Sequence, residues 1–177
     1  MQSSGKNSLM DNDAMNRVYL RHAYQYAMSC SKDPSTQLGA ILVKPQVGVI
    51  AWGVNGLPDR IKDTEDKWQY PKKSIYIEHA ERNVIYKCVE RGINTSGLIM
   101  YCPWFSCVDC ARAIIQAGIT KVIGHQDMFD IMPDRWKESC EKGINMLKEA
   151  GIVCVCWEGS VGENLFSIRV DGKEFYP

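Results

Sequence analysis

The chain has 177 residues, of which 45% are hydrophobic and 24% are charged. This composition is ordinary for a globular protein and excludes the disordered and fibrous classes, and the length predicts one domain with its own core. Lysine plus arginine and aspartate plus glutamate both total 21, so no net positive charge exists to hold a nucleic acid. Eight cysteines without a signal peptide or a long apolar run favour a reducing, cytoplasmic setting over a secreted or membrane-spanning protein.

The first predicted element is a helix that begins near residue 14. Residues 1–13 are polar and lack periodicity, so they are expected to form a flexible N-terminal arm, followed by a single domain over residues 14–177. Asp13 is available as the N-cap of the helix. Its expected buried stripe, set by helical spacing, is Met15, Val18, Tyr19, Ala23, Tyr26, Ala27 and Cys30. His22 lies on this stripe and is interpreted as a packed residue, not a metal ligand.

Two strands and a long connection follow. A turn is expected at residues 31–36, because the residue before Pro34 avoids the helical region. The apolar runs 38–43 and 49–54 predict a hairpin at one side of a sheet. Residues 59–77 have little regular pattern, and a connection of this length is typical of a lid or a binding loop, although its balanced charges also fit a solvated loop.

The second half of the chain alternates helices with strands. Helices are predicted at 79–91, 108–117 and 133–150, and strands at 97–101, 121–124 and 152–157, with a short added strand at 166–170. Because a helix connects the last two main strands, these strands should run parallel. The predicted fold class is α/β, a three-layer α/β/α domain with a mixed five-stranded sheet.

Two short motifs suggest a zinc site with an open position. They are His79-Ala80-Glu81 and Cys107-x-x-Cys110, each at the start of a predicted helix. A catalytic zinc takes three protein ligands and leaves one position for water, and one histidine with two cysteines supplies three. Glu81 lies two residues past the histidine and is placed to carry protons. This combination is the signature of zinc nucleobase deaminases.

Other interpretations of these motifs remain open. A Cys-x-x-Cys pair alone also occurs in redox centres and in four-ligand structural zinc sites. A structural site needs a fourth ligand, for which Cys102 is the nearest spare thiol in the sequence. The remaining cysteines lie mostly in apolar stretches, where a free cysteine behaves as a small hydrophobic residue. The joint occurrence with His-x-Glu favours the catalytic interpretation.

The sequence resembles the cytidine-deaminase-like zinc enzymes and, within them, the deoxycytidylate (dCMP) deaminases. The wider resemblance rests on the two zinc motifs. The narrower one rests on residues 31–40 (SKDPSTQLGA), 53–58 (GVNGLP), 79–85 (HAERNVI) and 110–119 (CARAIIQAGI). It implies zinc-dependent hydrolysis of dCMP to dUMP and ammonia, which supplies dUMP for thymidylate synthesis. It also implies that His79, Cys107 and Cys110 hold Zn²⁺ and that Glu81 moves protons.

The resemblance further implies substrate contacts at seven positions, which are Lys32, Ser35, Thr36, Asn55, Ala80, Trp104 and Phe105. The first three would meet the phosphate, although a capped turn explains them equally well. Asn55 would contact a sugar hydroxyl, and the small Ala80 would leave room for the ring. The two aromatic residues would wall the base or, alternatively, pack in the core under the metal-binding helix.

Two residues depart from the family pattern. Ser106 stands where the family usually has proline, which loosens the turn before Cys107 but removes no ligand. Relatives are often hexamers, activated by dCTP and inhibited by dTTP, so the resemblance implies a homo-oligomer, these effectors and Mg²⁺ bound with them. Val54 replaces the aromatic residue that regulated members often carry, and this weakens the expectation of regulation.

Two alternative functions remain. One is another zinc deaminase, acting on free cytidine, a purine base or a tRNA adenosine, of which the zero net charge weakens the tRNA version. The other is a non-catalytic nucleotide-binding regulator whose zinc is structural. Glu81 argues against the second alternative, because such a module does not need an unligated acid beside the ion.

Overall fold

The structure, a computed structural model, describes residues 13–162 and 165–177. The predicted N-terminal arm falls on residues 1–12, outside the described residues, except for Asp13, which is already helical. In the described part of the chain, no helix is both long enough and apolar enough to cross a bilayer.

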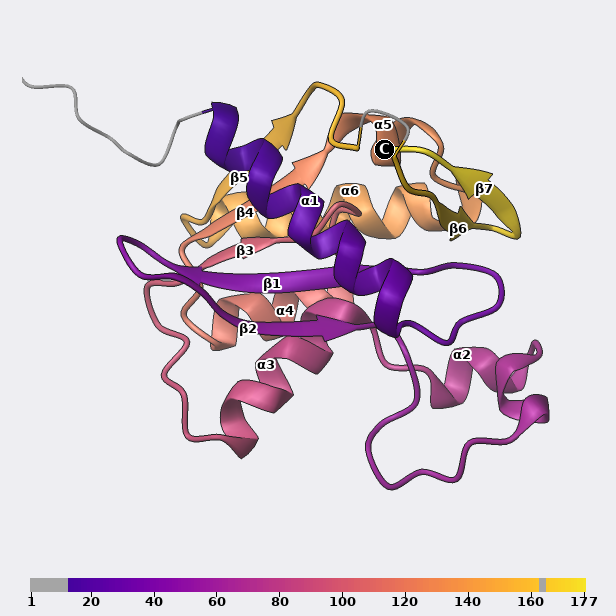
Figure 1. The fold of residues 1–177 in the computed structure, drawn as a ribbon. Helices are drawn as coiled ribbons and strands as arrows, with labels where there is room; N and C mark the ends of the chain where they lie inside the picture. The colour runs from indigo at the N-terminus through magenta and orange to yellow at the C-terminus, as the bar shows by residue number, and fades with distance from the viewer. Residues whose placement is uncertain (1–12, 163–164) are drawn as a thin grey trace, which may run out of the picture.

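A five-stranded sheet forms the centre of the fold (Figure 1). Its strands are β1 (Gly39–Lys44), β2 (Gly48–Val54), β3 (Ile99–Tyr101), β4 (Lys121–His125) and β5 (Val153–Trp157). They lie in the order β2-β1-β3-β4-β5, with β1 antiparallel to β2 and β3, and with β3, β4 and β5 parallel to one another. The predicted hairpin, the parallel pairing of the last two strands and the mixed sheet are therefore confirmed.

Helices cover both faces of this sheet, as the three-layer prediction requires (Figure 1). Helix α1 (Asp13–Cys30) lies on one face, α3 (Ala80–Glu90) and α4 (Val108–Gln116) lie on the other, and α6 (Asp134–Glu149) packs along α4. Successive residues of β1 alternate between two core clusters. Ile41 and Val43 belong to the cluster that contains α1, and Ala40 and Leu42 to the cluster that contains α3 and α4. Double coverage explains why β1 is apolar throughout.

The buried side of α1 differs from the predicted stripe. Met15 and Val18 are 37% and 42% exposed, and Cys30 is also exposed. Ala23 and Ala27 of the predicted stripe are buried, and Asn16, Leu20 and Tyr24, which were not part of it, are buried with them. The reason is a close backbone approach, since a Cβ added to Gly39 of β1 would lie 2.2 Å from the carbonyl oxygen of Ala23. This approach turns the small residues of α1 toward the sheet.

Three segments have more structure than the sequence predicted. Residues 59–77 contain a 3-10 helix, η1 (Glu65–Trp68), and α2 (Lys72–Tyr76), and α5 (Gln126–Asp130) follows β4. The strand expected at 166–170 is β6 (Ile168–Val170), which pairs with β7 (Lys173–Phe175) in a separate two-stranded sheet. Asp171 and Gly172 connect them with φ values of 50° and 79°, and an Asp-Gly pair with positive φ is typical of a two-residue hairpin turn.

Candidate active site and metal centre

The two motifs meet because each one begins a helix on the same face of the sheet. His79 is the N-cap residue of α3, and Cys107 is the N-cap residue of α4, with Cys110 in the first turn of α4. Helix N-termini carry partial positive charge, which favours a thiolate over a thiol. Two glycines allow this arrangement. A Cβ on Gly53 of β2 would lie 2.6 Å from the backbone nitrogen of Val84 in α3, and a Cβ on Gly143 of α6 would lie 2.2 Å from the carbonyl oxygen of Ser106.

The geometry of the three side chains fits a zinc ion. Nδ1 of His79 lies 3.6 Å from Sγ of Cys107 and 3.5 Å from Sγ of Cys110. With ordinary Zn–N and Zn–S bond lengths, a tetrahedral site places a nitrogen and a sulfur ligand about 3.6 Å apart. One nitrogen and two sulfurs also form a donor set that zinc prefers. The three residues present can therefore hold zinc and leave a fourth position open.

The charge state of these side chains also suits a metal. Hydrogen bonds from Cys110 and, after it, from His79 lower the pKa of Cys107 to about 3, against the opposing effect of burial. Cys107 is therefore a thiolate at neutral pH, which is the form that binds metal. The same contact with Cys107, together with burial, raises the pKa of Cys110. The two thiols thus share one proton, which a bound metal ion would displace.

Glu81 lies beside this cluster without belonging to it. It is 4% exposed and lines, with His79 and Cys107, a cavity of about 580 Å³. Burial raises the pKa of its carboxyl group, and the charge of His79 opposes this shift. A carboxyl group with a raised pKa, next to a metal position, holds a proton more readily than an exposed carboxylate and is suited to accept and return one.

The spare cysteines do not complete a four-ligand site in the described part of the chain. Within that part, the cluster of metal-binding atoms consists of His79, Cys107 and Cys110, and Cys102 is fully buried outside it. Cys140 lines the cavity but is also outside the cluster. Ser106, a departure from the expected family pattern, is fully buried, and its Oγ has no hydrogen-bond partner among the described residues.

Two aromatic residues predicted to wall the base lie at the cavity. Trp104 and Phe105 are 7% and 4% exposed, and both line it. A third aromatic residue, Trp136 of α6, lines the cavity and contacts the ring of His79 edge-on, with 5.4 Å between the ring centroids. Ala80, in contrast, is fully buried with its carbonyl oxygen facing β2, where it is 3.0 Å from the position of a Cβ on Gly53.

Asn55 lines the cavity, but its amide is bonded on every side to the protein. Its Oδ1 accepts hydrogen bonds from Ser31 Oγ and from the backbone nitrogen of Leu38, both at 2.8 Å. Its Nδ2 donates to Asp33 Oδ2 at 2.9 Å and to the carbonyl oxygen of Thr36 at 2.7 Å. Asn55 therefore holds the turn at residues 31–38 against the end of β2, and its contact with a sugar hydroxyl stays a prediction.

The three residues predicted to meet a phosphate are divided by the structure. Ser35 and Thr36 line the cavity, in a turn whose backbone nitrogens donate to Asp33 Oδ1 at 2.9 and 3.0 Å. Lys32 does not line it. Its side chain is 75% exposed, forms an ion pair with Asp63 at 3.0 Å, and lines a second cavity next to Val54.

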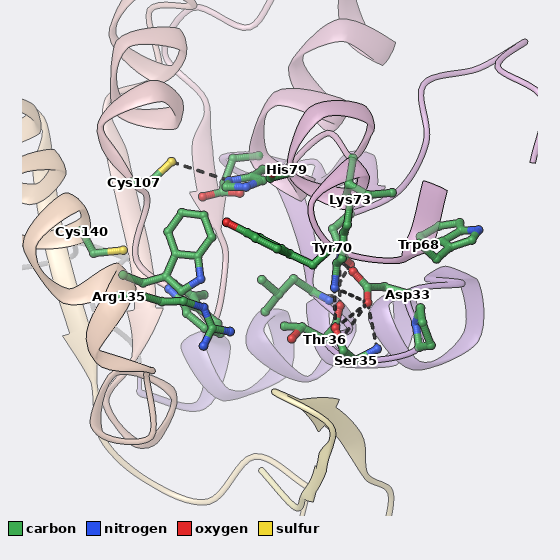
Figure 2. Close-up of a pocket in the computed structure, with 18 of the residues that line it drawn as sticks. Asp33, Ser35, Thr36, Trp68, Tyr70, Lys73, His79, Cys107, Arg135 and Cys140 are labelled. Carbon is green, nitrogen blue, oxygen red and sulfur yellow. Dashed lines mark hydrogen bonds and ion pairs between the residues drawn. The ribbon is translucent and has the colours of Figure 1, made fainter. Parts of the chain in front are cut away.

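The structure adds two cations to this site that the sequence motifs did not reveal. Lys73 of α2 and Arg135 of α6 line the cavity, and Figure 2 shows them on opposite sides of it, with Tyr70 extending between them. Lys73 donates to Asp33 Oδ1 at 2.7 Å and to Ser35 Oγ, whereas Arg135 pairs with Asp171 of the β6–β7 turn. The only sequence signal for Arg135 is its place just after Pro133, in the first turn of a helix.

Known proteins are similar to this chain in sequence and in fold. The family described as the cytidine and deoxycytidylate deaminase zinc-binding region matches residues 14–126. A probable deoxycytidylate deaminase of Drosophila melanogaster is 36% identical over 114 residues, which cover 58% of this chain and 55% of that protein. An uncharacterized deaminase of Aliivibrio fischeri is 34% identical over 124 residues, covering 70% of this chain and 81% of that protein.

A solved structure supports the fold. The dCMP deaminase of the cyanophage S-TIM5, in complex with dCMP and dUMP, aligns with a TM-score of 0.61 and 23% identity over 84% of this chain and 98% of that one. The chain spans little more than half the length of the Drosophila protein, but the matched family region contains both zinc motifs and Glu81. The chain therefore belongs to the cytidine and deoxycytidylate deaminase family.

Proposed function

We propose that the protein is a zinc-dependent hydrolase that converts dCMP to dUMP and ammonia, and so supplies dUMP for thymidylate synthesis. The observation that carries this proposal is that two residues of the metal cluster, His79 and Cys107, line one cavity with the buried, unligated Glu81. The choice of dCMP is supported by the relatives, since the Drosophila protein is named a probable deoxycytidylate deaminase and the phage enzyme was solved with dCMP and dUMP.

In the proposed reaction, the protein supplies the proton transfers. Zinc held by His79, Cys107 and Cys110 would, when bound, act as a Lewis acid that lowers the pKa of water toward neutrality. As the water oxygen bonds to C4 of cytosine, Glu81 accepts the released proton and delivers it to ring N3. Glu81 then moves the remaining hydroxyl proton to the amino nitrogen. The C4–N bond breaks, ammonia leaves, and the ring keeps a carbonyl group at C4.

The phosphate of dCMP is proposed to lie at the rim formed by Ser35, Thr36 and Arg135. Among the described residues that line the cavity, Lys73 and Arg135 are the lysine and arginine side chains. Lys73 is held by the buried carboxylate of Asp33, whereas Arg135 is 60% exposed and pairs with Asp171, which is 51% exposed. Exposed ion pairs contribute little free energy, so Arg135 is the cation that can turn toward a phosphate.

Substrate comparison tests this function. Ammonia release should be measured from dCMP, deoxycytidine, guanine and a tRNA, with and without a chelator. We expect dCMP to be the best substrate and activity to be lost with the chelator and restored by zinc. Equal turnover of deoxycytidine would contradict phosphate recognition, and turnover of guanine or tRNA alone would assign the protein to another zinc deaminase.

Substitution of Arg135 tests the phosphate contact separately. Arg135→Met should raise KM for dCMP at least about tenfold, the size of one charge-assisted hydrogen bond, and leave kcat/KM for deoxycytidine unchanged. Arg112→Met is the matched control, since Arg112 is an exposed arginine that pairs with Asp109 on α4 and does not line the cavity. If Arg135→Met weakened both substrates equally, its role would be structural.

We also propose that dCTP and dTTP act at the second cavity. This cavity, of about 570 Å³, lies beside Val54 and contains the cations Lys32, Arg60 and Lys87, with acidic groups of Asp59 and Asp63 that suit Mg²⁺. Initial rates with dCTP and Mg²⁺, and with dTTP, test this regulation, and rates that do not respond to either nucleotide would contradict it. Sedimentation with and without dCTP tests a separate expectation, assembly into a homo-oligomer such as a hexamer.

We place the enzyme in the cytoplasm. Its eight cysteines are all free, and four of them, Cys88, Cys102, Cys107 and Cys110, are buried at or near the metal-binding helices. A reducing compartment keeps such thiols available to zinc. Activity in a soluble cell fraction, and not in membranes or medium, checks this placement.

A further inference from the structure

Arg82 of α3 connects the two halves of the metal centre. Its Nη1 donates to Sγ of Cys110 at 3.5 Å, and its Nε donates to Oε1 of Glu78 at 2.5 Å. The same Glu78 oxygen accepts a hydrogen bond from the backbone nitrogen of His79 at 2.9 Å. One continuous set of hydrogen bonds therefore runs from the histidine ligand through Glu78 and Arg82 to a cysteine ligand.

This set is anchored to the sheet and shielded from solvent. The backbone of Glu78 forms two hydrogen bonds with Gly56, which follows β2, at 2.8 and 3.0 Å. The side chains of Arg82 and Glu78 are 16% and 19% exposed. Because both charges are largely buried, each depends on its partner, and loss of one leaves the other uncompensated. The guanidinium group is therefore held in one place, with one nitrogen directed at Cys110.

The charge of Arg82 suits a thiolate-rich metal site. Two thiolates and a neutral histidine bring two negative charges to a divalent ion, and the carboxylate of Glu81 adds a third in the same buried region. A cation in hydrogen-bond contact with one thiolate lowers the repulsion among these groups. Removing a residue that hydrogen-bonds to a metal ligand typically weakens metal binding.

We propose that Arg82, oriented by Glu78, is a positioning residue of the metal centre that fixes Cys110 against His79 and strengthens the binding of the ion. The inference rests on the proposed function only in taking that ion to be zinc. It assigns a role to Arg82 that neither the His-x-Glu motif nor the Cys-x-x-Cys motif contains. The guanidinium group touches the ligand and not the substrate, so its effect should appear first in metal binding.

Zinc affinity of the full chain is the decisive measurement. Zinc should be competed against a chromophoric chelator in the native protein and in Arg82→Met, Arg82→Lys and the control Arg112→Met, which removes an exposed arginine on α4. We expect Arg82→Met to weaken zinc binding about 10- to 100-fold and Arg82→Lys, which keeps the charge, to restore part of the loss. The control should retain native affinity. The cobalt-substituted Arg82→Met protein should show an altered thiolate-to-cobalt absorption band.

Several outcomes would overturn the proposal. Native zinc affinity in Arg82→Met, or an equal loss in Arg112→Met, would each do so. A fall in the melting temperature of metal-free Arg82→Met as large as that of the zinc-loaded protein would show a general packing role instead. If the native chain bound no zinc, the proposed function and this inference would fail together. If it bound zinc and deaminated dCMP while Arg82→Met kept native affinity, this inference alone would fail.

Discussion

The proposed chemistry depends on Glu81, because this acid lies beside the metal ligands and does not itself bind the metal. Glu81→Gln keeps the size of the side chain but cannot accept a proton from water. We expect kcat for dCMP to fall about 10²- to 10⁴-fold, the usual contribution of a general acid–base group, while the protein retains one zinc per chain. Ammonia release and metal analysis on the same preparation measure both quantities.

Two outcomes would count against this assignment. Full deamination by a folded, zinc-loaded Glu81→Gln protein would exclude Glu81 as the proton carrier. Loss of zinc together with activity would show that Glu81 supports the metal site, and it would favour a structural zinc. Asp109→Asn, an exposed acid between the two cysteines, is the matched control and should change neither quantity.

Substitution should have different effects at Cys110, a member of the metal cluster, and at Cys102, a buried cysteine outside it. Cys110→Ala leaves two protein ligands, too few for a stable zinc site, and should lose zinc, activity and the part of thermal stability that zinc provides. Cys102→Ala removes a buried thiol outside the cluster and should keep one zinc per chain. Metal analysis and thermal melts compare the two variants. A zinc-free Cys102→Ala protein would indicate a closed, four-ligand site.

The site residues that the sequence predicts are those that lie close to one another in the chain. His79 with Glu81, and Cys107 with Cys110, lie within a few residues of each other at helix starts, so spacing alone brings each pair together. Arg135 reaches the cavity only because α6 packs along α4, and Lys73 only because α2 lies against the turn at Asp33. Contacts between such distant segments leave no periodic signal, so this part of the site could not be predicted.

At the scale of elements, Gly143 decides how closely α6 approaches the metal centre. An alanine in a helix interior normally stabilises it relative to glycine, but here the new Cβ would lie 2.2 Å from the Ser106 carbonyl oxygen and 3.0 Å from the carbonyl carbon of Cys107. We expect Gly143→Ala to destabilise the protein by about 1–3 kcal/mol, as overpacking does, and to weaken zinc binding by displacing Cys107.

Denaturant unfolding and zinc competition measure these two effects of Gly143→Ala. The control is Asn145→Ala, at an exposed position of the same helix, which should leave both quantities unchanged or slightly raise stability. Native stability in Gly143→Ala would mean that α6 can move away from the Cys107 segment without cost. In that case the close contact would not position the ligand.

Element prediction succeeded where hydrophobic periodicity was strong and failed where backbone contact decided the outcome. The five strands and the helices α3, α4 and α6 follow from apolar runs and from the glycines that end them. The orientation of α1 does not follow from its apolar residues. Gly39 lets the backbone near Ala23 approach β1, and this contact decides which side of α1 is buried. Helices as short as η1 and α2 contain too few residues to show a period.

For the whole molecule, one buried histidine makes stability depend on pH. His125, fully buried at the end of β4, has its Nε2 2.8 Å from the carbonyl oxygen of Gly159, to which it donates, so its Nδ1 accepts the hydrogen bond of Tyr24 at 2.6 Å. Burial lowers the pKa of His125 below its ordinary value, against a smaller opposing effect of Gly159. The folded state therefore holds the ring neutral.

The sign of the pH effect follows from this shift. Below a pH of about 6.5 the unfolded chain protonates His125 while the folded chain does not, so the free energy of unfolding falls as pH decreases. The slope reaches at most about 1.4 kcal/mol per pH unit and ends at the lowered pKa of the folded state. Denaturant unfolding between pH 7.5 and 5.5 measures it. His125→Gln should remove this component, and an unchanged slope in that variant would assign the effect to other groups.

The order of the strands also has a kinetic consequence. Strands β1 and β2 are neighbours in the chain and form their ladder locally, whereas β3 must find β1 across more than fifty residues, pairing Ile99 with Val43. His79 and Cys107 lie on either side of β3 in sequence, so their side chains meet only after this long-range pairing is made. A zinc ion that binds only after this pairing, and so after the folding barrier, would slow unfolding without speeding folding. The lifetime of the folded enzyme, more than the speed at which it forms, would therefore depend on the supply of zinc.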